Sequence, residues 1–364
     1  MNGSFGKIWI TCVVVISMSC GDNQSDRRKH GSVSEVWSKE RAVEWQRTNG
    51  WLVGCTFIPS NAINQLEMWQ EDSYDPETID RELGWASSLG FNIVRVYLHH
   101  LVWEENPEGF KERMHDFLRI TDTNQLKVMF VFFDDCWNGD PQLGTQPEPI
   151  PGVHNSGWVQ CPGQKQVTDT TLYPVLKQYV QDIVHEFKDD SRVAIWDMYN
   201  EPGNEHHGNE SLPLLKKSFE WAREIQPSQP ITSAVWRFSK DFEKINDFLI
   251  RHSDVISFHN YMNVESVRKT IHNLKQHGRP LICTEYLART RDSNFESHLP
   301  MFKEENVGAV NWGLVSGKTQ TIFPWGSKQG TPEPELWYHD IFHKDGKPFD
   351  SSEVKIIREL VLGK

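Results

Sequence analysis

The feature that most constrains this chain is an alternation of short apolar runs with longer amphipathic stretches, from about residue 50 to residue 313. This alternation is typical of βα units, in which parallel strands pack against helices. We expect strands at Trp51–Phe57, Asn92–Leu98, Lys127–Phe133, Val193–Asn200, Ile231–Val235, Val255–His259, Leu281–Glu285 and Ala309–Gly313. Helices are expected at Pro76–Leu89, Phe110–Asn124, Leu172–Phe187 and Leu212–Glu224.

Eight strand–helix units predict an α/β fold, a (β/α)8 TIM barrel in a single domain over residues 41–364. Such a barrel needs about 250 residues, and the chain has 364. An open, doubly wound sheet is the alternative. The absence of a Gly-rich phosphate loop from the sequence favours the closed barrel. No internal repeat and no second domain are evident in the sequence.

The first twenty residues have the pattern of a secretory signal peptide. Lys7 precedes an apolar run at Ile8–Ile16, and small residues follow up to Cys20. Residues 17–20, Ser-Met-Ser-Cys, resemble a bacterial lipobox, which predicts a lipoprotein signal peptide over residues 1–20 and lipidation of Cys20. Plain cleavage without a lipid is the alternative. Residues 21–40 are mostly polar and predict a flexible tether. We therefore expect a secreted protein of the bacterial cell envelope, attached to a membrane only through the lipid.

Four further cysteines belong to the predicted domain. Cys55 and Cys283 fall inside strand-like runs, where a free cysteine is usually a small buried hydrophobe. Cys136 and Cys161 bracket one long loop and could form a disulfide in an oxidising compartment. The sequence has no C-x-x-C pair, which argues against a structural zinc site.

The loop after the third expected strand, from Asp134 to about Asp169, has no helical or strand periodicity. A loop of this length is usually functional or disordered, and the aromatic residues Trp137, His154 and Trp158 argue against disorder. In a barrel it would stand at the C-terminal face of the strands, where active sites form. The loop could block one end of a cleft, which would favour an exo-acting enzyme or short substrates.

Two glutamates follow apolar strands at their C-terminal ends. Glu201 ends the run Trp-Asp-Met-Tyr-Asn-Glu-Pro-Gly at residues 196–203, and Glu285 ends the expected strand Leu281–Glu285. Both would project from the same face of a barrel. Retaining glycosidases use such a pair of carboxyl groups, about 5–5.5 Å apart, as nucleophile and as acid/base. A loop charge is the plain alternative for either residue alone.

These motifs resemble those of the clan A retaining glycoside hydrolases, and most closely glycoside hydrolase family 5, the cellulase and mannanase family. The resemblance implies hydrolysis of β-glycosidic bonds in extracellular oligo- or polysaccharides, with a carbohydrate as the partner and no cofactor. It assigns Glu201 as the acid/base and Glu285 as the nucleophile. One departure concerns the third strand. Family 5 cellulases often carry a histidine motif after it, whereas residues 133–137 here read Phe-Asp-Asp-Cys-Trp, which leaves the substrate class open.

The resemblance also implies a set of substrate-binding residues. Asn200 would bond the sugar 2-hydroxyl, Arg95 would lie beside the nucleophile, and Tyr261 would contact it. The other matched positions are His259 and the strand-eight Trp312, which would floor the sugar site. From the residues themselves, Arg95 could instead be the structural partner of a barrel carboxylate, and His259 a core histidine.

The chain has 15 tryptophans, more than core packing alone usually needs. Trp137 and Trp312 are the best candidates for platforms that stack on sugar rings. Trp85 and Trp221 fall within helical periods and are expected in the core. The remaining candidates in loops after strands are Trp69, Trp103, Trp158, Trp236 and Trp325.

Other classes of function fit the sequence less well. A net charge of −12 argues against nucleic-acid binding. A metal-dependent hydrolase would need clustered histidines, but His99-His100 and His206-His207 are adjacent pairs whose side chains would point opposite ways on a strand. We therefore predict no metal site. A catalytically inactive sugar-binding lipoprotein on the same barrel is the remaining alternative, and the presence of both glutamates argues against it.

Overall fold

The structure is a computed structural model that describes residues 1–3, 6 and 35–363. The predicted signal peptide, the lipidation site Cys20 and most of the predicted tether lie outside the described residues. No helix within residues 35–363 is both long enough and apolar enough to cross a membrane.

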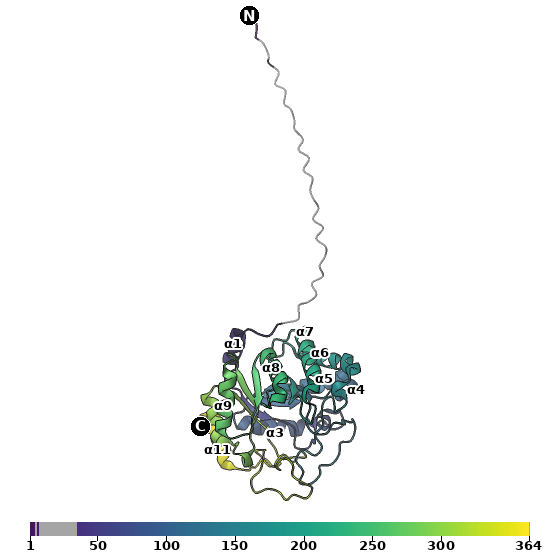
Figure 1. The fold of residues 1–364 in the computed structure, drawn as a ribbon, viewed down its shortest axis with the longest axis vertical. Helices are drawn as coiled ribbons and strands as arrows, with labels where there is room; N and C mark the ends of the chain where they lie inside the picture. The colour runs from purple at the N-terminus through teal and green to yellow at the C-terminus, as the bar shows by residue number, and fades with distance from the viewer. Residues whose placement is uncertain (4–5, 7–34, 364) are drawn as a thin grey trace. The chain divides into compact units, whose positions relative to one another are not determined.

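Eight parallel strands form one sheet, in the order β5-β4-β3-β2-β1-β8-β7-β6. Helices surround this sheet on the outside (Figure 1), so the predicted (β/α)8 barrel is confirmed. The strands are β1 (Val53–Thr56), β2 (Ile93–Tyr97), β3 (Lys127–Asp134), β4 (Val193–Asn200), β5 (Ile231–Thr232), β6 (Ile256–His259), β7 (Leu281–Glu285) and β8 (Gly308–Asn311).

The helices follow the strands in the order expected of βα units. They are α1 (Lys39–Asn49), α2 (Gln65–Trp69), α3 (Pro76–Ser88), α4 (His100–Glu105), α5 (Pro107–Thr123), α6 (Tyr173–Phe187), α7 (Leu212–Ile225), α8 (Glu243–His252), α9 (Val264–Lys275), α10 (Phe295–Glu304) and α11 (Ser351–Leu362). Helix α5 begins three residues earlier than its apolar periodicity predicts. Asn106 caps it by accepting from the backbone N–H of Gly109, and Pro107 stands in its first turn, where a missing N–H is tolerated.

The barrel closes between β5 and β6 through few contacts. Strand β5 ends at Thr232, three residues short of the predicted Val235. Val235 still reaches β6, since its N–H donates to the carbonyl of Ser257 at 3.0 Å and its carbonyl accepts from the N–H of His259 at 3.0 Å. The eight strands therefore enclose a continuous interior, although the last seam is an isolated bridge.

Alternation along the strands separates two apolar layers. On β2, Val94 and Val96 belong to the large cluster between the sheet and the helices, whereas Ile93 belongs to a smaller cluster with residues of β3, β4, β7 and β8. Because side chains alternate along a strand, Arg95 shares the inner face with Ile93. The apolar floor of the barrel thus lies directly beneath the polar residues at the C-terminal ends of its strands.

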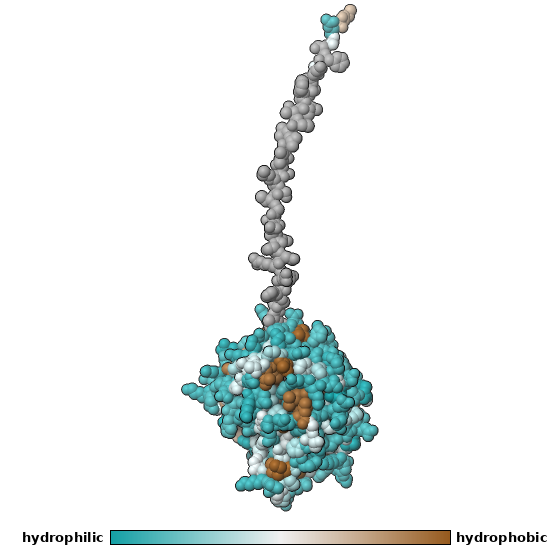
Figure 2. Space-filling model, turned by 90° about the vertical axis from the view of Figure 1, so that its right-hand side faces the viewer, coloured by the Kyte–Doolittle hydropathy of each residue, from teal (hydrophilic) through white to brown (hydrophobic). Residues whose placement is uncertain are grey.

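The packed domain begins before the predicted boundary at residue 41. Helix α1 starts at Lys39, where Ser38 caps it. The Trp37 side chain is buried, and its backbone N–H donates to Oδ1 of Asp254 at 2.8 Å. Residues 37–40, which the sequence assigned to a flexible tether, are therefore part of the folded domain. The outer surface is mostly hydrophilic, with isolated apolar patches on the face that Figure 2 shows.

The tryptophans divide between the core and the cleft. Trp221 is buried and Trp85 packs against the main core cluster, as the helical periods predict. Trp69, Trp103 and Trp158 are also buried, although they follow strand ends in the sequence. Their indole N–H groups are bound within the protein, to the Tyr97 carbonyl in the case of Trp69 and to aspartates in the other two.

Candidate active site

The two predicted acids meet at the mouth of the barrel. Glu285 is the last residue of β7, and Glu201 follows the last residue of β4. One carboxylate oxygen of each lies within 4.8 Å of the other. Glu201 has a φ of +43°, in the left-handed region that residues other than glycine rarely adopt. This sharp turn between strand and loop aims the acid across the mouth toward Glu285, and such backbone strain is concentrated at functional sites.

A cleft of about 960 Å³ opens above the two glutamates. Most of the residues predicted to bind substrate line it, namely Trp137, Asn200, His259, Tyr261 and Trp312. Arg95 does not line the cleft. Its side chain is completely buried beneath Glu285, so a contact with substrate would have to pass through that carboxylate.

Glu285 is held by three donors. Nη1 of Arg95 lies 2.6 Å from Oε1, and the hydroxyl of Tyr97 donates to the same oxygen at 3.0 Å. The hydroxyl of Tyr261 donates to Oε2 at 2.7 Å. Hydrogen bonds from a guanidinium and two hydroxyls fix the orientation of this carboxyl group.

Arg95 has a second acidic partner, Asp197 on β4, which sequence reasoning missed. Nε and Nη2 of Arg95 both donate to Oδ2 of Asp197, at 3.0 and 2.8 Å, and Nη2 also donates to Oδ1 of Asn200 at 2.8 Å. Burial raises the pKa of Asp197 to about 6, against the opposing effect of Arg95. A lone aspartate within the apolar run of β4 is the sequence signal that could have revealed this pair.

Glu201 is bonded by uncharged side chains, whereas Glu285 contacts the guanidinium of Arg95. Nδ1 of His259 lies 2.9 Å from its Oε1, and Nδ2 of Asn204 donates to Oε2 at 2.7 Å. Burial raises the pKa of Glu201 to about 7, although the hydrogen bond from Cys136 and the charge of Arg95 oppose the shift. Burial lowers the pKa of His259 to about 3, so this imidazole is neutral near pH 7. A carboxyl group with a raised pKa can hold a proton near neutral pH and donate it.

Cys136 occupies the position after β3 at which the sequence departs from family 5. Its thiol donates to Oε2 of Glu201 at 3.4 Å and accepts from the amides of Asn200 and Asn204 at 3.3 and 3.4 Å. Asp134 accepts from the backbone N–H of Cys136 at 2.9 Å and from Nδ2 of Asn200 at 2.8 Å. The residues after β3 therefore support both the acid and the neighbouring asparagine.

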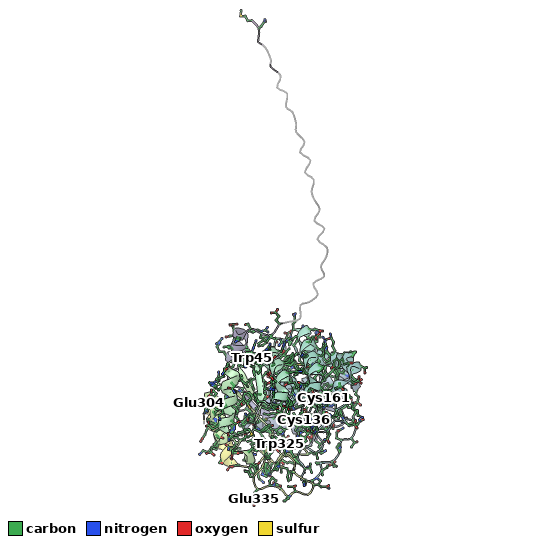
Figure 3. All side chains as sticks on the ribbon, viewed as in Figure 1. Trp45, Cys136, Cys161, Glu304, Trp325 and Glu335 are labelled. Carbon is green, nitrogen blue, oxygen red and sulfur yellow. The ribbon has the colours of Figure 1, made fainter. Side chains whose placement is uncertain are left out.

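The disulfide considered between Cys136 and Cys161 does not form. All four cysteines of the described domain are free and buried. Sγ of Cys161 lies 3.5 Å from Nδ1 of His100, on the side of β3 that faces the helices. Both cysteines lie inside the body of the domain (Figure 3). The thiol of Cys136 lies in the active site, and the thiol of Cys161 lies in the core.

Asp135 fixes the turn that carries Glu201. Its Oδ2 accepts from the backbone N–H of Gly203 at 2.7 Å and from the hydroxyl of Ser211 at 2.5 Å. Its Oδ1 accepts from the hydroxyl of Tyr199 at 2.7 Å. A carboxylate thus holds both ends of the strained turn, which explains how a residue with positive φ can be kept in place.

Two groups of described residues have metal-ligand chemistry, and neither geometry favours an ion. In the buried group of His99, His100 and Cys161, Nε2 of His99 bonds the Gln160 carbonyl and Nδ1 accepts from the N–H of Leu101. In the group of Glu201, His259 and Glu285, both Glu285 oxygens already accept from three donors, one of them a cation. Positive charge at that position would repel a second cation.

Aromatic side chains surround the cleft. Trp312, 9% exposed, packs edge-on to Tyr97 and Trp158. Tyr261 contacts Trp325 edge-on with ring centroids 4.9 Å apart, and Trp137 lies 5.4 Å from the ring of His154. Flat apolar faces of this kind stack on the C–H faces of sugars. The predicted platforms Trp137 and Trp312 therefore do lie in the cleft.

Comparisons with known proteins agree with this geometry. The family model described as cellulase (glycosyl hydrolase family 5) matches residues 59–318. No curated protein matches the chain. Among solved structures, a GH5_18 variant from Streptomyces cattleya bound to Manβ1-4GlcNAc has a TM-score of 0.59 at 14% identity, covering 86% of this chain and 80% of that one.

Two further solved structures have a similar fold. The exo-β-1,4-mannosidase of Opitutaceae bacterium strain TAV5 has a TM-score of 0.57 at 16% identity, with 86% of this chain and 60% of that chain covered. The endo-β-1,4-mannanase of Thermotoga petrophila has a TM-score of 0.56 at 13% identity, with 87% and 77% covered. Because the family model spans more than half of the sequence and includes both strand-end glutamates, this chain belongs to glycosyl hydrolase family 5 and is a glycoside hydrolase.

Proposed function

We propose that this enzyme hydrolyses β-glycosidic bonds with retention of configuration, with Glu285 as nucleophile and Glu201 as acid/base. The observation that carries the proposal is the separation of the two carboxyl groups, whose oxygens lie within 4.8 Å of each other. Retaining enzymes have carboxyl groups about 5–5.5 Å apart, whereas inverting enzymes need about 6.5–9.5 Å to admit a water between acid and base.

The reaction then runs in two steps. In the first, Oε2 or Oε1 of Glu285 attacks the anomeric carbon while protonated Glu201 gives its proton to the leaving oxygen. This step forms the glycosyl–Glu285 ester and releases the aglycone. In the second, ionised Glu201 takes a proton from water, the water oxygen bonds the same carbon, and Glu285 departs as a carboxylate. Glu201 ends protonated, ready for another cycle.

Supporting residues have separate tasks in this scheme. Tyr261 and Arg95 orient the Glu285 carboxyl group, because they donate to its two different oxygens. The raised pKa of Glu201, about 7, keeps its proton available near neutral pH. Asn200 lines the cleft directly before Glu201, and we assign to it the contact with the sugar 2-hydroxyl.

We further propose β-mannosides as the first substrates to test. The structural neighbours named above act on or bind β-1,4-linked mannose. A panel of para-nitrophenyl β-glycosides, with mannans, glucans and xylans beside it, identifies the sugar.

Retention is tested by product stereochemistry and by trapping. NMR of the first-formed product should show the β anomer, and a 2-deoxy-2-fluoro β-glycoside of the accepted sugar should leave a stable adduct on the peptide that contains Glu285. Appearance of the α anomer first would reject the mechanism. A Glu285→Ala variant should lose several orders of magnitude in rate on every substrate, activated ones included.

We propose, from the sequence alone, that the enzyme is secreted and attached to the bacterial envelope through a lipid on Cys20. In cells fed labelled palmitate, the full chain should incorporate label and fractionate with membranes. The Cys20→Ser variant should incorporate none and retain its hydrolytic activity. Labelling that survives the substitution would refute this anchor site.

A further inference from the structure

Three loops join into a wall on one side of the cleft. They are residues 57–64 after β1, residues 150–158 after β3 and residues 317–331 after β8, and together we call them the glycone wall. The N–H of Asn155 donates to the Thr319 carbonyl at 2.8 Å, and the N–H of Gly330 donates to the Pro151 carbonyl at 2.8 Å. Nε2 of Gln320 donates to the carbonyl of Ile150 at 2.7 Å. The loops after β3 and β8 are therefore bonded backbone to backbone.

The loop after β1 completes the wall. The N–H of Lys318 donates to the Ser60 carbonyl at 3.0 Å, and Nδ2 of Asn64 donates to the Gly157 carbonyl at 2.8 Å. A Cβ at Gly317 would collide with the Ser60 backbone, so only glycine permits so close an approach of the two loops. Behind Trp312, a separate cavity lined by Ile58 and Thr319 among others measures about 10 Å³. That is room for about one water molecule and for no sugar.

The positions of the acids decide which part of a substrate faces this wall. Around the barrel, a line from Glu201 on β4 to Glu285 on β7 separates β5 and β6 from β8, β1, β2 and β3. Trp312, directly after β8, lies on the second side, and so does Tyr97 at the end of β2. Under the proposed mechanism, the sugar attacked by Glu285 rests over Trp312, and Glu201 protonates the oxygen on the other side of that sugar. The wall thus faces the glycone, and the leaving group extends over β5 and β6.

The inner face of the wall carries an asparagine without a partner. Asn155 lines the cleft and is 1% exposed, yet neither its amide nitrogen nor its amide oxygen has a hydrogen-bond partner within the described chain. Among the described residues that line the cleft, only His259 shares this feature, through one nitrogen. An unsatisfied buried amide is costly. The φ of Asn155 is +50°, so the backbone of this residue is also held in a sparsely occupied region.

Two neutral imidazoles, His154 and His339, line the cleft together with Asn155 and contact each other edge-on. Nδ1 of His154 donates to the Phe323 carbonyl at 2.7 Å, and Nδ1 of His339 donates to the Leu287 carbonyl. Burial lowers the pKa of His154 to about 4 and that of His339 well below its usual range. With Nδ1 carrying the proton, Nε2 of each ring is an acceptor. An amide and two acceptors without charge are suited to sugar hydroxyls rather than to a carboxylate.

The opposite side of the cleft is open. Phe238, after β5, is 54% exposed, and Met262, after β6, is 45% exposed. Trp236 and Met262 also line the cleft on the side of β5 and β6. Exposed apolar side chains at a cleft mouth give a surface on which further sugars can lie.

From these observations we propose that the glycone wall closes one end of the cleft. Between the wall and the cleaved bond there is room for one neutral sugar, and the terminal hydroxyls of this sugar bind Asn155. The enzyme therefore removes single sugars from the non-reducing end of a chain, while the rest of the chain extends over β5 and β6. This inference rests on the proposed function, because it takes Glu285 as the group that attacks the anomeric carbon.

The mode of cleavage is tested on β-1,4-mannohexaose and cellohexaose labelled at the reducing end. Exo action at the non-reducing end releases an unlabelled monosaccharide first and shortens the labelled product one sugar at a time. Early labelled disaccharide or trisaccharide would mean internal cleavage and would overturn the inference. The anomer measured by NMR on an aryl glycoside tests the proposed function separately, since retention is independent of where a chain is cut.

The role of Asn155 is tested with a matched pair of variants. Asn155→Ala and Asn306→Ala both remove an asparagine from a left-handed position, with φ of +50° and +52°. Asn306 is exposed in the turn before β8, so it shares the backbone strain without the cleft. On the accepted para-nitrophenyl β-glycoside, kcat/KM should fall about 10- to 100-fold for Asn155→Ala, from one or two lost hydrogen bonds, and remain unchanged for Asn306→Ala.

Deoxy substrates separate binding from a structural role. Analogues of the aryl glycoside that lack the hydroxyl at O3, O4 or O6 should include one that wild type hydrolyses about tenfold more slowly. Asn155→Ala should not discriminate against that analogue, because the partner of the missing hydroxyl is already gone. If Asn155→Ala retains the full discrimination, or loses no activity, the proposed contact is wrong.

Discussion

The guanidinium of Arg95 touches Glu285 through Nη1 at 2.6 Å, and its other edge is clamped by Asp197. Arg95 and Asp197 are completely buried, and Glu285 is nearly so. One guanidinium therefore bridges two carboxyl groups, one in the core and one at the floor of the cleft. Because Asp197 fixes the guanidinium from below, Arg95 can present Nη1 to the nucleophile without moving toward the cleft.

Replacing Asp197 by alanine should destabilise the enzyme and slow it. Removing one partner of a buried ion pair typically costs about 3–5 kcal/mol. We expect a loss of this order in the free energy of unfolding, measured by urea denaturation, together with a fall in kcat. Glu44→Ala is the control, since the exposed Glu44–Arg47 pair is of a kind worth about 0–1 kcal/mol. Equal stability of the two variants would show that Asp197 does not clamp Arg95.

The acid/base role of Glu201 predicts a dependence on the leaving group. Glu201→Ala should lose activity on natural glycosides but retain much of it on aryl glycosides with good leaving groups, because those need little protonation in the first step. Added azide should restore turnover and give a β-glycosyl azide, which NMR identifies. An equal loss on all substrates without azide rescue would contradict the assignment.

The raised pKa of Glu201 has a consequence for stability. The folded chain holds the Glu201 proton with a pKa of about 7, against an ordinary value of 4.5. The folded state thus binds this proton more tightly than the unfolded state does. The stability that protonated Glu201 contributes is therefore present at low pH and is lost as pH rises from about 4.5 to 7. Glu201→Gln stays neutral at every pH. Its free energy of unfolding should therefore rise by about 3 kcal/mol relative to that of wild type between pH 5 and pH 8. If the Tm of the two proteins changes with pH in the same way, the raised pKa of Glu201 is refuted.

Cys136 should tune the pH dependence of catalysis. Protonated Glu201 is the active form in the first step, so kcat/KM should fall as pH rises through about 7. The hydrogen bond from Cys136 lowers the pKa of Glu201, and Cys136→Ala should therefore move the alkaline limb of kcat/KM to higher pH. Cys55→Ala removes a buried thiol from β1 and should leave the limb in place. If the alkaline limb of kcat/KM does not move in Cys136→Ala, Cys136 does not tune the pKa of Glu201.

The sequence alone predicted the barrel and the two glutamates because both depend on local patterns. Apolar runs and helical periods repeat within short windows, and the limits of β4 and β7 coincide with those predicted. Glu201 and Glu285 end such runs, and parallel strands in a barrel bring their C-terminal ends to one face. The resemblance to family 5 rests on these same strand-end residues.

Only the tertiary structure revealed the partners that these residues meet. Asp197 becomes a clamp because β2 places Arg95 opposite it, and Cys136 becomes a neighbour of the acid because β3 pairs with β4. The same holds for Asn155, whose place in the cleft depends on a loop after β3 bonding to a loop after β8. Contacts between distant segments leave no periodic trace in the chain, and loops have no repeating geometry from which their path can be inferred. The sequence determined where the acids stand, and packing decided what surrounds them.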